Sequence, residues 1–301
     1  MMTQNISDLH AAMEENFLAY FLLGLVPLPH FQLFNDAELT WAVSSKFPGW
    51  NTVLRTQLSS ETAAARVQAL VDSFKSNGRP LGWLVLPSSR PVDLPSHLLA
   101  NGLKQVNNRP HMLVDLHTLP VWADQSAVGE AGADALGAAL SGSEGNGADQ
   151  SALGTVNRPL RVPVGLLIER VNDGASFAQW YQATVAGFEM TLANAEIYYE
   201  AYTRAGFDPA GPFLHYVGYL DGEPVTSSTL LLTDNMAGIY DVSTAPAVRG
   251  RGLGTAITLF PLLEARARGY RYACLQSSPE GYNVYRGLGF ETQYHERIFA
   301  I

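Results

Sequence analysis

Gly250, Gly252 and Gly254 stand between a predicted strand and a predicted helix in the C-terminal half of the chain. The apolar run 237–242 indicates the strand, and apolar residues that recur at helical spacing over 253–263 indicate the helix. The first turn of a helix leaves backbone N–H groups unpaired at the positive end of the helix dipole. Glycines have no Cβ atom, so this backbone can come close to a ligand. The run therefore predicts an anion site, for which a pyrophosphate is the usual ligand.

The spacing of these glycines discriminates between phosphate-binding loops. A P-loop requires a lysine directly after its glycines, and none follows here. The dinucleotide fingerprint is Gly-x-Gly-x-x-Gly, whereas this loop is Gly-x-Gly-x-Gly. The pattern that fits is Arg-x-x-Gly-x-Gly, with Arg249, Gly252 and Gly254 at its fixed positions. This pattern resembles the pyrophosphate loop of the GNAT acetyltransferase superfamily. The alternative is an ordinary glycine-rich turn that caps a helix.

A second motif follows, one predicted helix and one predicted strand further along the chain. Tyr285, Gly289 and Phe290 form the pattern Tyr-x-x-x-Gly-Phe ahead of a final strand. This pattern resembles the closing helix of the same superfamily, in which the tyrosine faces the sulfur of coenzyme A. Alone it is weak, because helices often end in a glycine followed by an apolar residue. The two motifs in this order are specific, and the resemblance covers roughly residues 160–301.

The resemblance implies transfer of an acetyl group from acetyl-CoA to an amine by direct attack, with acetyl-CoA as co-substrate and without a metal. Tyr285 would then act as general acid to the coenzyme A thiolate. In relatives a backbone N–H on the strand before the glycine loop stabilises the oxyanion, and this position corresponds to Val242. The cofactor-binding residues implied by the resemblance are Val242, Ser243, Thr244, Arg249, Gly250, Arg251, Gly252, Leu253, Gly254, Thr255, Ser277, Asn283, Tyr285 and Arg286.

The acceptor amine must also lose a proton before it can attack. An alkyl ammonium ion with a pKa near 10 is only about 0.1% neutral at pH 7. Asp241, Glu280, Glu223 and His215 could accept this proton directly or through water. No sequence motif identifies any of the four as a catalytic base, and each also fits an ordinary surface or hydrogen-bonding role.

The C-terminal half also begins in the order that the superfamily implies. Alternating apolar residues at 162–168 predict a first strand, and two helical stretches follow at 177–188 and 192–205. In relatives these two helices shape the acceptor site. Two further strands, at 213–220 and 225–232, flank a predicted hairpin turn.

The N-terminal half resembles a degenerate copy of this pattern. A strand is predicted at 50–56, an amphipathic helix at 67–74 and another strand at 82–86, in the order and spacing of the C-terminal half. The segment 58–63 replaces the glycine loop and holds no glycine, while its Glu61 would repel a phosphate. We therefore expect this half not to bind coenzyme A.

The expected fold class is α/β, with two GNAT-like domains that each have a central mixed β-sheet flanked by helices. A tandem arrangement with an inactive first domain is known in the superfamily, and Leu98 stands here in the position of Tyr285. The predicted boundaries are 1–120 for the degenerate domain, 121–158 for an Ala-, Gly- and Ser-rich linker, and 159–301 for the catalytic domain. The alternative is an unrelated α/β domain over the first 120 residues.

Composition argues against several other classes of protein. A formal net charge of -9 disfavours nucleic-acid binding, and the seven histidines lack metal-ligand spacing. Cys274 is the single cysteine, so no intramolecular disulfide can form. The apolar run 17–29 has no basic flank and is too short to span a bilayer. We expect a cytoplasmic monomer or homodimer that acts on a small-molecule amine and binds no membrane.

A second hypothesis is a non-catalytic module that senses acyl-CoA or binds a partner protein. Such a module could dispense with Tyr285, so the pairing of this tyrosine with the glycine loop favours the enzyme.

Overall fold

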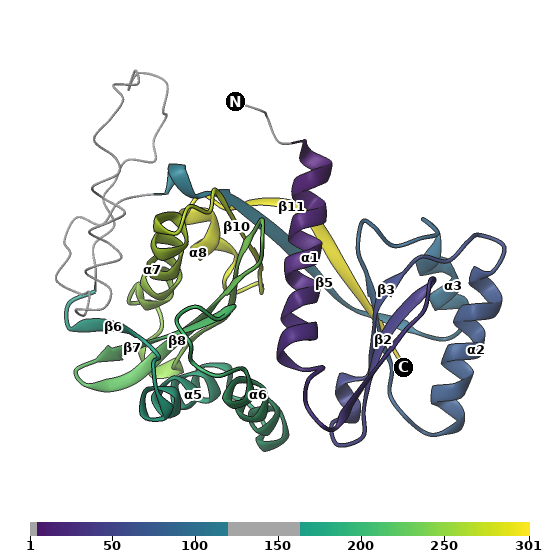
Figure 1. The fold of residues 1–301 in the computed structure, drawn as a ribbon, viewed down its shortest axis with the longest axis horizontal. Helices are drawn as coiled ribbons and strands as arrows, with labels where there is room; N and C mark the ends of the chain where they lie inside the picture. The colour runs from purple at the N-terminus through teal and green to yellow at the C-terminus, as the bar shows by residue number, and fades with distance from the viewer. Residues whose placement is uncertain (1–4, 120–162) are drawn as a thin grey trace. The chain divides into compact units, whose positions relative to one another are not determined.

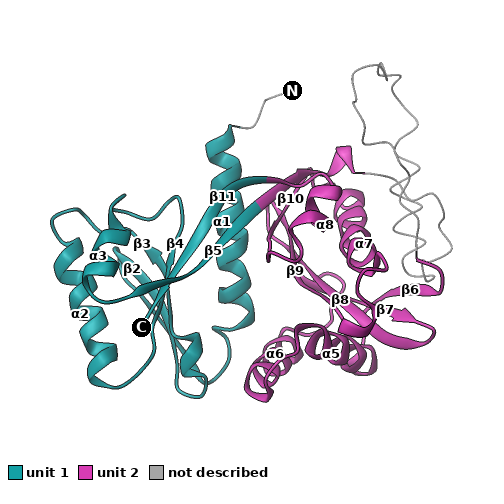
Figure 2. Cartoon of the chain, turned by 180° about the vertical axis from the view of Figure 1, so that it is seen from behind, with its two compact units in different colours: residues 1–111, 292–301 teal, residues 112–291 magenta. Residues whose placement is uncertain are grey.

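The computed structural model describes residues 5–119 and 163–301, so the linker predicted at 121–158 lies outside the described residues. The chain divides into two compact units (Figure 2). Unit 1 comprises Met1–His111 and Thr292–Ile301, and unit 2 comprises Met112–Glu291. The expected C-terminal domain ran to residue 301, whereas the structure assigns the last ten residues to unit 1.

The strands of unit 1 follow the order β1-β2-β3-β4-β11-β5, with parallel and antiparallel pairs. Its elements are α1 (Ile6–Gly24), β1 (Phe31–Asn35), β2 (Leu39–Ser44), β3 (Thr52–Thr56), α2 (Ala63–Ser76), β4 (Gly82–Val85), α3 (Leu94–Ala100), β5 (Lys104–Asp115) and β11 (Glu291–Ala300). Strands β3 and β4 are parallel, and β11 pairs with β4 in the antiparallel sense. Phe299 of β11 is buried in one core with Val67 and Phe74 of α2 and Trp83 of β4. The last strand of the chain therefore completes the core of unit 1.

The strands of unit 2 follow the order β5-β10-β9-β8-β7-β6, with parallel and antiparallel pairs, and β5 enters this unit at Met112. Its other elements are β6 (Leu166–Arg170), α5 (Gly174–Phe188), α6 (Leu192–Ala205), β7 (Phe213–Leu220), β8 (Glu223–Leu232), β9 (Ala237–Thr244), α7 (Leu253–Ala267), β10 (Tyr272–Gln276) and α8 (Tyr282–Gly287). Short 3₁₀ turns lie at Pro48–Trp50 in unit 1 and at Leu116–Thr118 and Pro246–Val248 in unit 2. The α/β fold class with mixed sheets is thus confirmed.

Helices cover both faces of the unit 2 sheet, with α7 on one face and α5 and α6 on the other (Figure 1). On the α7 face, Ile257 is buried against Leu230 and Ile239 of the sheet. On the other face, the rings of Trp180, Tyr202 and His215 contact one another. None of the described helices is long and apolar enough to cross a membrane.

Local sequence signals set the ends of these elements. Asp173 accepts a hydrogen bond from the backbone N–H of Ser176 at 2.8 Å and forms a capping box that begins α5. Asp221 and Gly222 both have positive φ, at 54° and 87°, and form the two-residue turn between β7 and β8. Two central residues with positive φ match the twist of the flanking strands, which is typical of a two-residue hairpin turn. The turn therefore forms the hairpin predicted for this segment.

Candidate functional site

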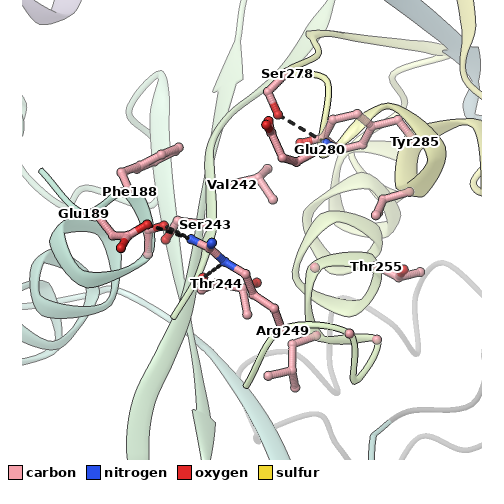
Figure 3. Close-up of a pocket in the computed structure, with 17 residues that line it drawn as sticks. Phe188, Glu189, Val242, Ser243, Thr244, Arg249, Thr255, Ser278, Glu280 and Tyr285 are labelled. Atoms are coloured by element: carbon pink, nitrogen blue, oxygen red, sulfur yellow. Dashed lines mark hydrogen bonds and ion pairs between the residues drawn. The ribbon is translucent and has the colours of Figure 1, made fainter. Parts of the chain in front are cut away.

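The candidate site of unit 2 opens where two neighbouring parallel strands separate. The paired residues of β9 and β10 are Ala237–Ile239 and Ala273–Leu275. Strand β9 runs on to Thr244 beyond this pairing. A cavity of about 650 Å³ lies at the end of β9 (Figure 3).

Four parts of unit 2 contribute to the wall of this cavity. They are the end of α5, the end of β9, the glycine loop with the start of α7, and the segment from β10 into α8. The lining residues are Gly187, Phe188, Glu189, Val242, Ser243, Thr244, Arg249, Gly250, Gly252, Leu253, Gly254, Thr255, Ser278, Glu280, Gly281, Val284 and Tyr285. The structure therefore brings the glycine loop and Tyr285, which are far apart in sequence, to one cavity.

Two residues of the glycine loop adopt backbone angles that favour glycine. Gly250 and Gly252 have φ values of 76° and 83°, in the left-handed region that favours glycine. A Cβ atom at Gly250 would meet nothing within 4 Å, so the backbone angle rather than space requires glycine there. Gly252 is the N-cap of α7 and supplies no side-chain hydrogen bond to the first turn. The first N–H groups of α7 are thus left without a side-chain cap beside the cavity.

Arg249 connects the glycine loop to the end of α5. Its guanidinium donates from Nε to the carbonyl oxygen of Thr244 at 3.0 Å and from Nη2 to that of Gly187 at 2.7 Å. Nη2 also lies 3.8 Å from Oε2 of Glu189 (Figure 3). The side chain predicted to bind phosphate therefore also holds two segments of the cavity wall together.

Tyr285 lies on α8, on the opposite side of the cavity from Val242 of β9 (Figure 3). It is 8% exposed, and burial raises the pKa of its hydroxyl. Its ring also explains a neighbouring glycine, because a Cβ atom at Gly281 would lie 2.7 Å from a ring carbon. The phenol is consequently protonated at neutral pH and can act as a hydrogen-bond donor at the cavity.

Among the predicted bases, Glu280 is the one that lines the cavity. Hydrogen bonds from its own backbone N–H and from Ser278 lower the pKa of its carboxyl group. The carboxylate of Asp241 is instead buried and accepts a hydrogen bond from the hydroxyl of Tyr202 at 2.6 Å. Glu223 is exposed at the start of β8, away from the lining residues.

His215 is also outside the cavity wall. Its ring is 1% exposed, its Nδ1 lies 2.9 Å from Oγ1 of Thr229, and burial lowers its pKa from 6.5 to about 3. A base must reach the proton that it removes, and this side chain is enclosed in the core.

Four predicted cofactor residues are not part of the cavity wall within the described chain, namely Arg251, Ser277, Asn283 and Arg286. The hydroxyl of Ser277 is buried and donates to the carbonyl oxygen of Ser278 at 2.7 Å. The guanidinium of Arg286 lies over the ring of Tyr282 at 6.0 Å.

Phe188 and Glu189 line the cavity at the end of the helix expected to shape the acceptor site. The wall also contains four residues that the sequence does not single out: Gly187, Ser278, Gly281 and Val284. Gly187 carried a signal, because a glycine inside a helix often marks a close approach. A Cβ atom there would lie 2.6 Å from Cβ of Ser243 and 2.9 Å from the backbone nitrogen of Thr244. Glycine at this position therefore lets α5 lie directly against β9.

Comparisons with known proteins concern the fold that holds this cavity. Residues 177–290 match the acetyltransferase (GNAT) family. A search of the curated proteins found no match. Among solved structures, a GCN5-related N-acetyltransferase from Kribbella flavida is similar over 97% of this chain and 95% of that chain, with 14% identity and a TM-score of 0.65. A tandem GNAT protein from the clavulanic acid biosynthesis pathway is similar over 99% of this chain and 96% of that chain, with 15% identity and a TM-score of 0.56.

Identities at this level show that the fold is shared, over almost the full length of a tandem GNAT protein. The family match covers α5 through α8, which hold the glycine loop and Tyr285. Residues 177–290 of this chain are accordingly an acetyltransferase domain of the GNAT family.

Proposed function

We propose that unit 2 transfers the acetyl group of acetyl-CoA to the amine of a small-molecule acceptor. The observation that carries this proposal is the cavity where β9 continues beyond its pairing with β10, which has the N-terminus of α7 in its wall. A pyrophosphate suits the uncapped first turn of α7, since the backbone N–H groups and the helix dipole both favour an anion. The thioester end of the cofactor would then extend between Val242 and Tyr285.

Each bond change in the transfer has a group beside the cavity that can serve it. The amine nitrogen forms a bond to the acetyl carbon, and the backbone N–H of Val242 stabilises the oxyanion that develops. The carbon–sulfur bond then breaks, and the sulfur leaves with a proton. Tyr285 lies at the cavity and can serve this last step, because its protonated phenol can donate a hydrogen bond to the leaving sulfur; its raised pKa makes it a weaker acid than an exposed tyrosine.

The charge of Glu280 favours an ammonium acceptor. Its lowered pKa keeps the carboxylate ionised at neutral pH, so it attracts a cation to the cavity but is a weak base. We infer that the proton of the acceptor leaves through water rather than directly to Glu280.

We further propose that unit 1 is a degenerate GNAT-like domain that binds no cofactor. Support comes from the segments that follow the parallel strands β3 and β4. These two segments pair with each other through backbone hydrogen bonds and leave no opening between them. Arg90 forms a parallel bridge with Gln57, its N–H donates to the carbonyl oxygen of Thr56 at 3.0 Å, and its carbonyl accepts from the N–H of Leu58 at 3.1 Å. The chain there contains no glycine between residues 57 and 77.

Gly254→Glu offers a sharp test of the cofactor site. Gly254 does not have positive φ, and a Cβ atom there would meet nothing closer than 3.8 Å, so a side chain fits the fold. A carboxylate in the first turn of a helix also stabilises that helix. It would nevertheless occupy the proposed phosphate position and repel the cofactor.

Calorimetry with acetyl-CoA should show that the natural protein binds one molecule per chain. For Gly254→Glu the affinity should fall by at least about 100-fold, equivalent to about 2.7 kcal/mol. The matched control is Ser60→Glu, which places the same charge in the corresponding exposed turn of unit 1. Undiminished binding in Gly254→Glu would refute the loop assignment, and two molecules per chain would refute the inactive unit 1. Binding without thiol release for any amine in a broad panel would favour the sensor.

A further inference from the structure

An irregularity in strand β9 lies next to the cavity. In the pairing of β8 with β9, Ser227 faces Ser243 and Thr229 faces Tyr240. One residue of β8 is therefore opposite two residues of β9, Asp241 and Val242, which is the arrangement of a β-bulge. Asp241 has a φ of 51°, in the left-handed region.

Three buried side chains form hydrogen bonds at this bulge. The indole of Trp180 on α5 donates to the carbonyl oxygen of Ser228 at 3.1 Å. The hydroxyl of Ser227 donates to the carbonyl oxygen of Asp241 at 3.1 Å. The hydroxyl of Tyr202 on α6 donates to Oδ2 of Asp241 at 2.6 Å. Trp180, Ser227 and Tyr202 are 0%, 0% and 3% exposed.

The conformation of Asp241 determines where the next backbone N–H points. The N–H of Val242 belongs to the peptide plane between Asp241 and Val242, and ψ of Asp241 rotates that plane. Val242 lines the cavity, whereas Asp241 is not part of its wall. A change of Asp241 from the left-handed to the extended region would therefore turn this N–H to a different direction.

We propose that Tyr202 is a positioning residue, whose hydrogen bond to the carboxylate of Asp241 holds the bulge and aims the N–H of Val242 into the cavity. This inference rests on the proposed function, in which that N–H stabilises the oxyanion. Residues other than glycine, asparagine and aspartate are uncommon in the left-handed region. In the structure the hydrogen bond from Tyr202 restrains the side chain of Asp241 in this conformation. Tyr202 reaches the bulge from α6, which contributes no lining residue in the described chain, so a helix outside the cavity wall affects the geometry of the cavity.

Tyr202→Phe removes the hydroxyl and keeps the ring in its aromatic cluster. We expect kcat to fall by about 10- to 100-fold, the loss typical of a hydrogen bond to a charged group. The dissociation constant of acetyl-CoA should change by less than about threefold, because oxyanion stabilisation acts mainly in the transition state. The matched control is Tyr199→Phe on the same helix, which is 48% exposed and should retain its kcat.

Substitutions of Asp241 separate a positioning role from a role as general base. Asparagine tolerates the left-handed region and keeps an acceptor oxygen for Tyr202, so Asp241→Asn should retain about tenfold more kcat than Asp241→Ala. If Asp241 were the base, both variants would lose activity equally, and the acidic limb of the pH profile of kcat/KM would disappear in both. That result, or an unchanged kcat in Tyr202→Phe, would overturn the proposal.

Hydrogen–deuterium exchange tests the same inference without turnover. The backbone amides of residues 240–244 should exchange faster in Tyr202→Phe than in the natural protein, while those of α7 stay unchanged. Unchanged exchange at 240–244 would overturn the proposal. Absence of acetyl transfer by the natural protein to any amine would instead refute the proposed function, and the exchange result would still decide whether Tyr202 holds the bulge.

Discussion

Protonation of His215 should limit the stability of unit 2 in acid. The imidazole lies on β7 between aromatic rings, with centroid distances of 4.5 Å to Tyr202 and 4.7 Å to Trp180. Its Nε2 has no hydrogen-bond partner among the described residues. No group is therefore available at Nε2 to stabilise a positive charge, and burial lowers the pKa from 6.5 to about 3.

The magnitude follows from the difference between the two pKa values. The native state keeps His215 neutral, whereas the unfolded chain binds a proton below pH 6.5. A depressed pKa in the folded state means that stability is full above pH 6.5 and is lost as the pH falls toward 3. The slope is about 1.4 kcal/mol per pH unit, so His215 should cost about 2 kcal/mol at pH 5. This is a large fraction of the roughly 5–15 kcal/mol that stabilises a typical domain.

Urea unfolding followed by tryptophan fluorescence at pH 7.5 and pH 5.0 measures this loss. His215→Gln removes the titration of this side chain. Between pH 7.5 and pH 5.0, the free energy of unfolding should therefore fall by about 2 kcal/mol less in this variant than in the natural protein. The control is His117→Gln, the same substitution at an exposed position of unit 2. Equal pH dependence in the natural protein and in His215→Gln would refute the reasoning.

Two further predictions concern the cavity wall. Tyr285→Phe should lower kcat by about 10- to 1,000-fold in steady-state kinetics. The dissociation constant of acetyl-CoA, measured by calorimetry, should change by less than about threefold. An unchanged kcat would mean that this tyrosine only packs in the core. Gly187→Ala should destabilise unit 2 by about 1–3 kcal/mol in thermal unfolding, because its Cβ would lie 2.9 Å from the backbone nitrogen of Thr244. Exposed Gly174, where a Cβ would meet nothing within 4 Å, is the control for the same substitution, and equal effects at both glycines would contradict the close approach.

Features that depend on short-range sequence could be predicted. The turn at Asp221 and Gly222 and the helix that begins after the glycine loop are both set by residues a few positions apart. Such features follow from backbone sterics and capping, which act locally. The fold class followed from the order of these local elements.

Features that depend on long-range partners could not be predicted. A final strand is predicted after Phe290, but nothing in its sequence specifies pairing with β4 and burial of Phe299 in unit 1. The motif assigned Arg249 to phosphate, whereas two of its donors also reach carbonyl oxygens of Thr244 and Gly187. The contact between α5 and β9 joins residues more than 50 positions apart, and only Gly187 marked it in the sequence.

The two units differ in the backbone that follows their parallel strands as well as in the glycine loop. In unit 2 the pairing of the parallel strands ends at Ile239, and the bulge at Asp241 follows directly. In unit 1 the chain after β4 returns to β3, and Arg90 pairs with the backbone of Thr56 and Leu58. Glycines introduced into the turn after β3 would therefore not create a cofactor site by themselves, because the backbone groups that the cofactor would need are already paired with each other.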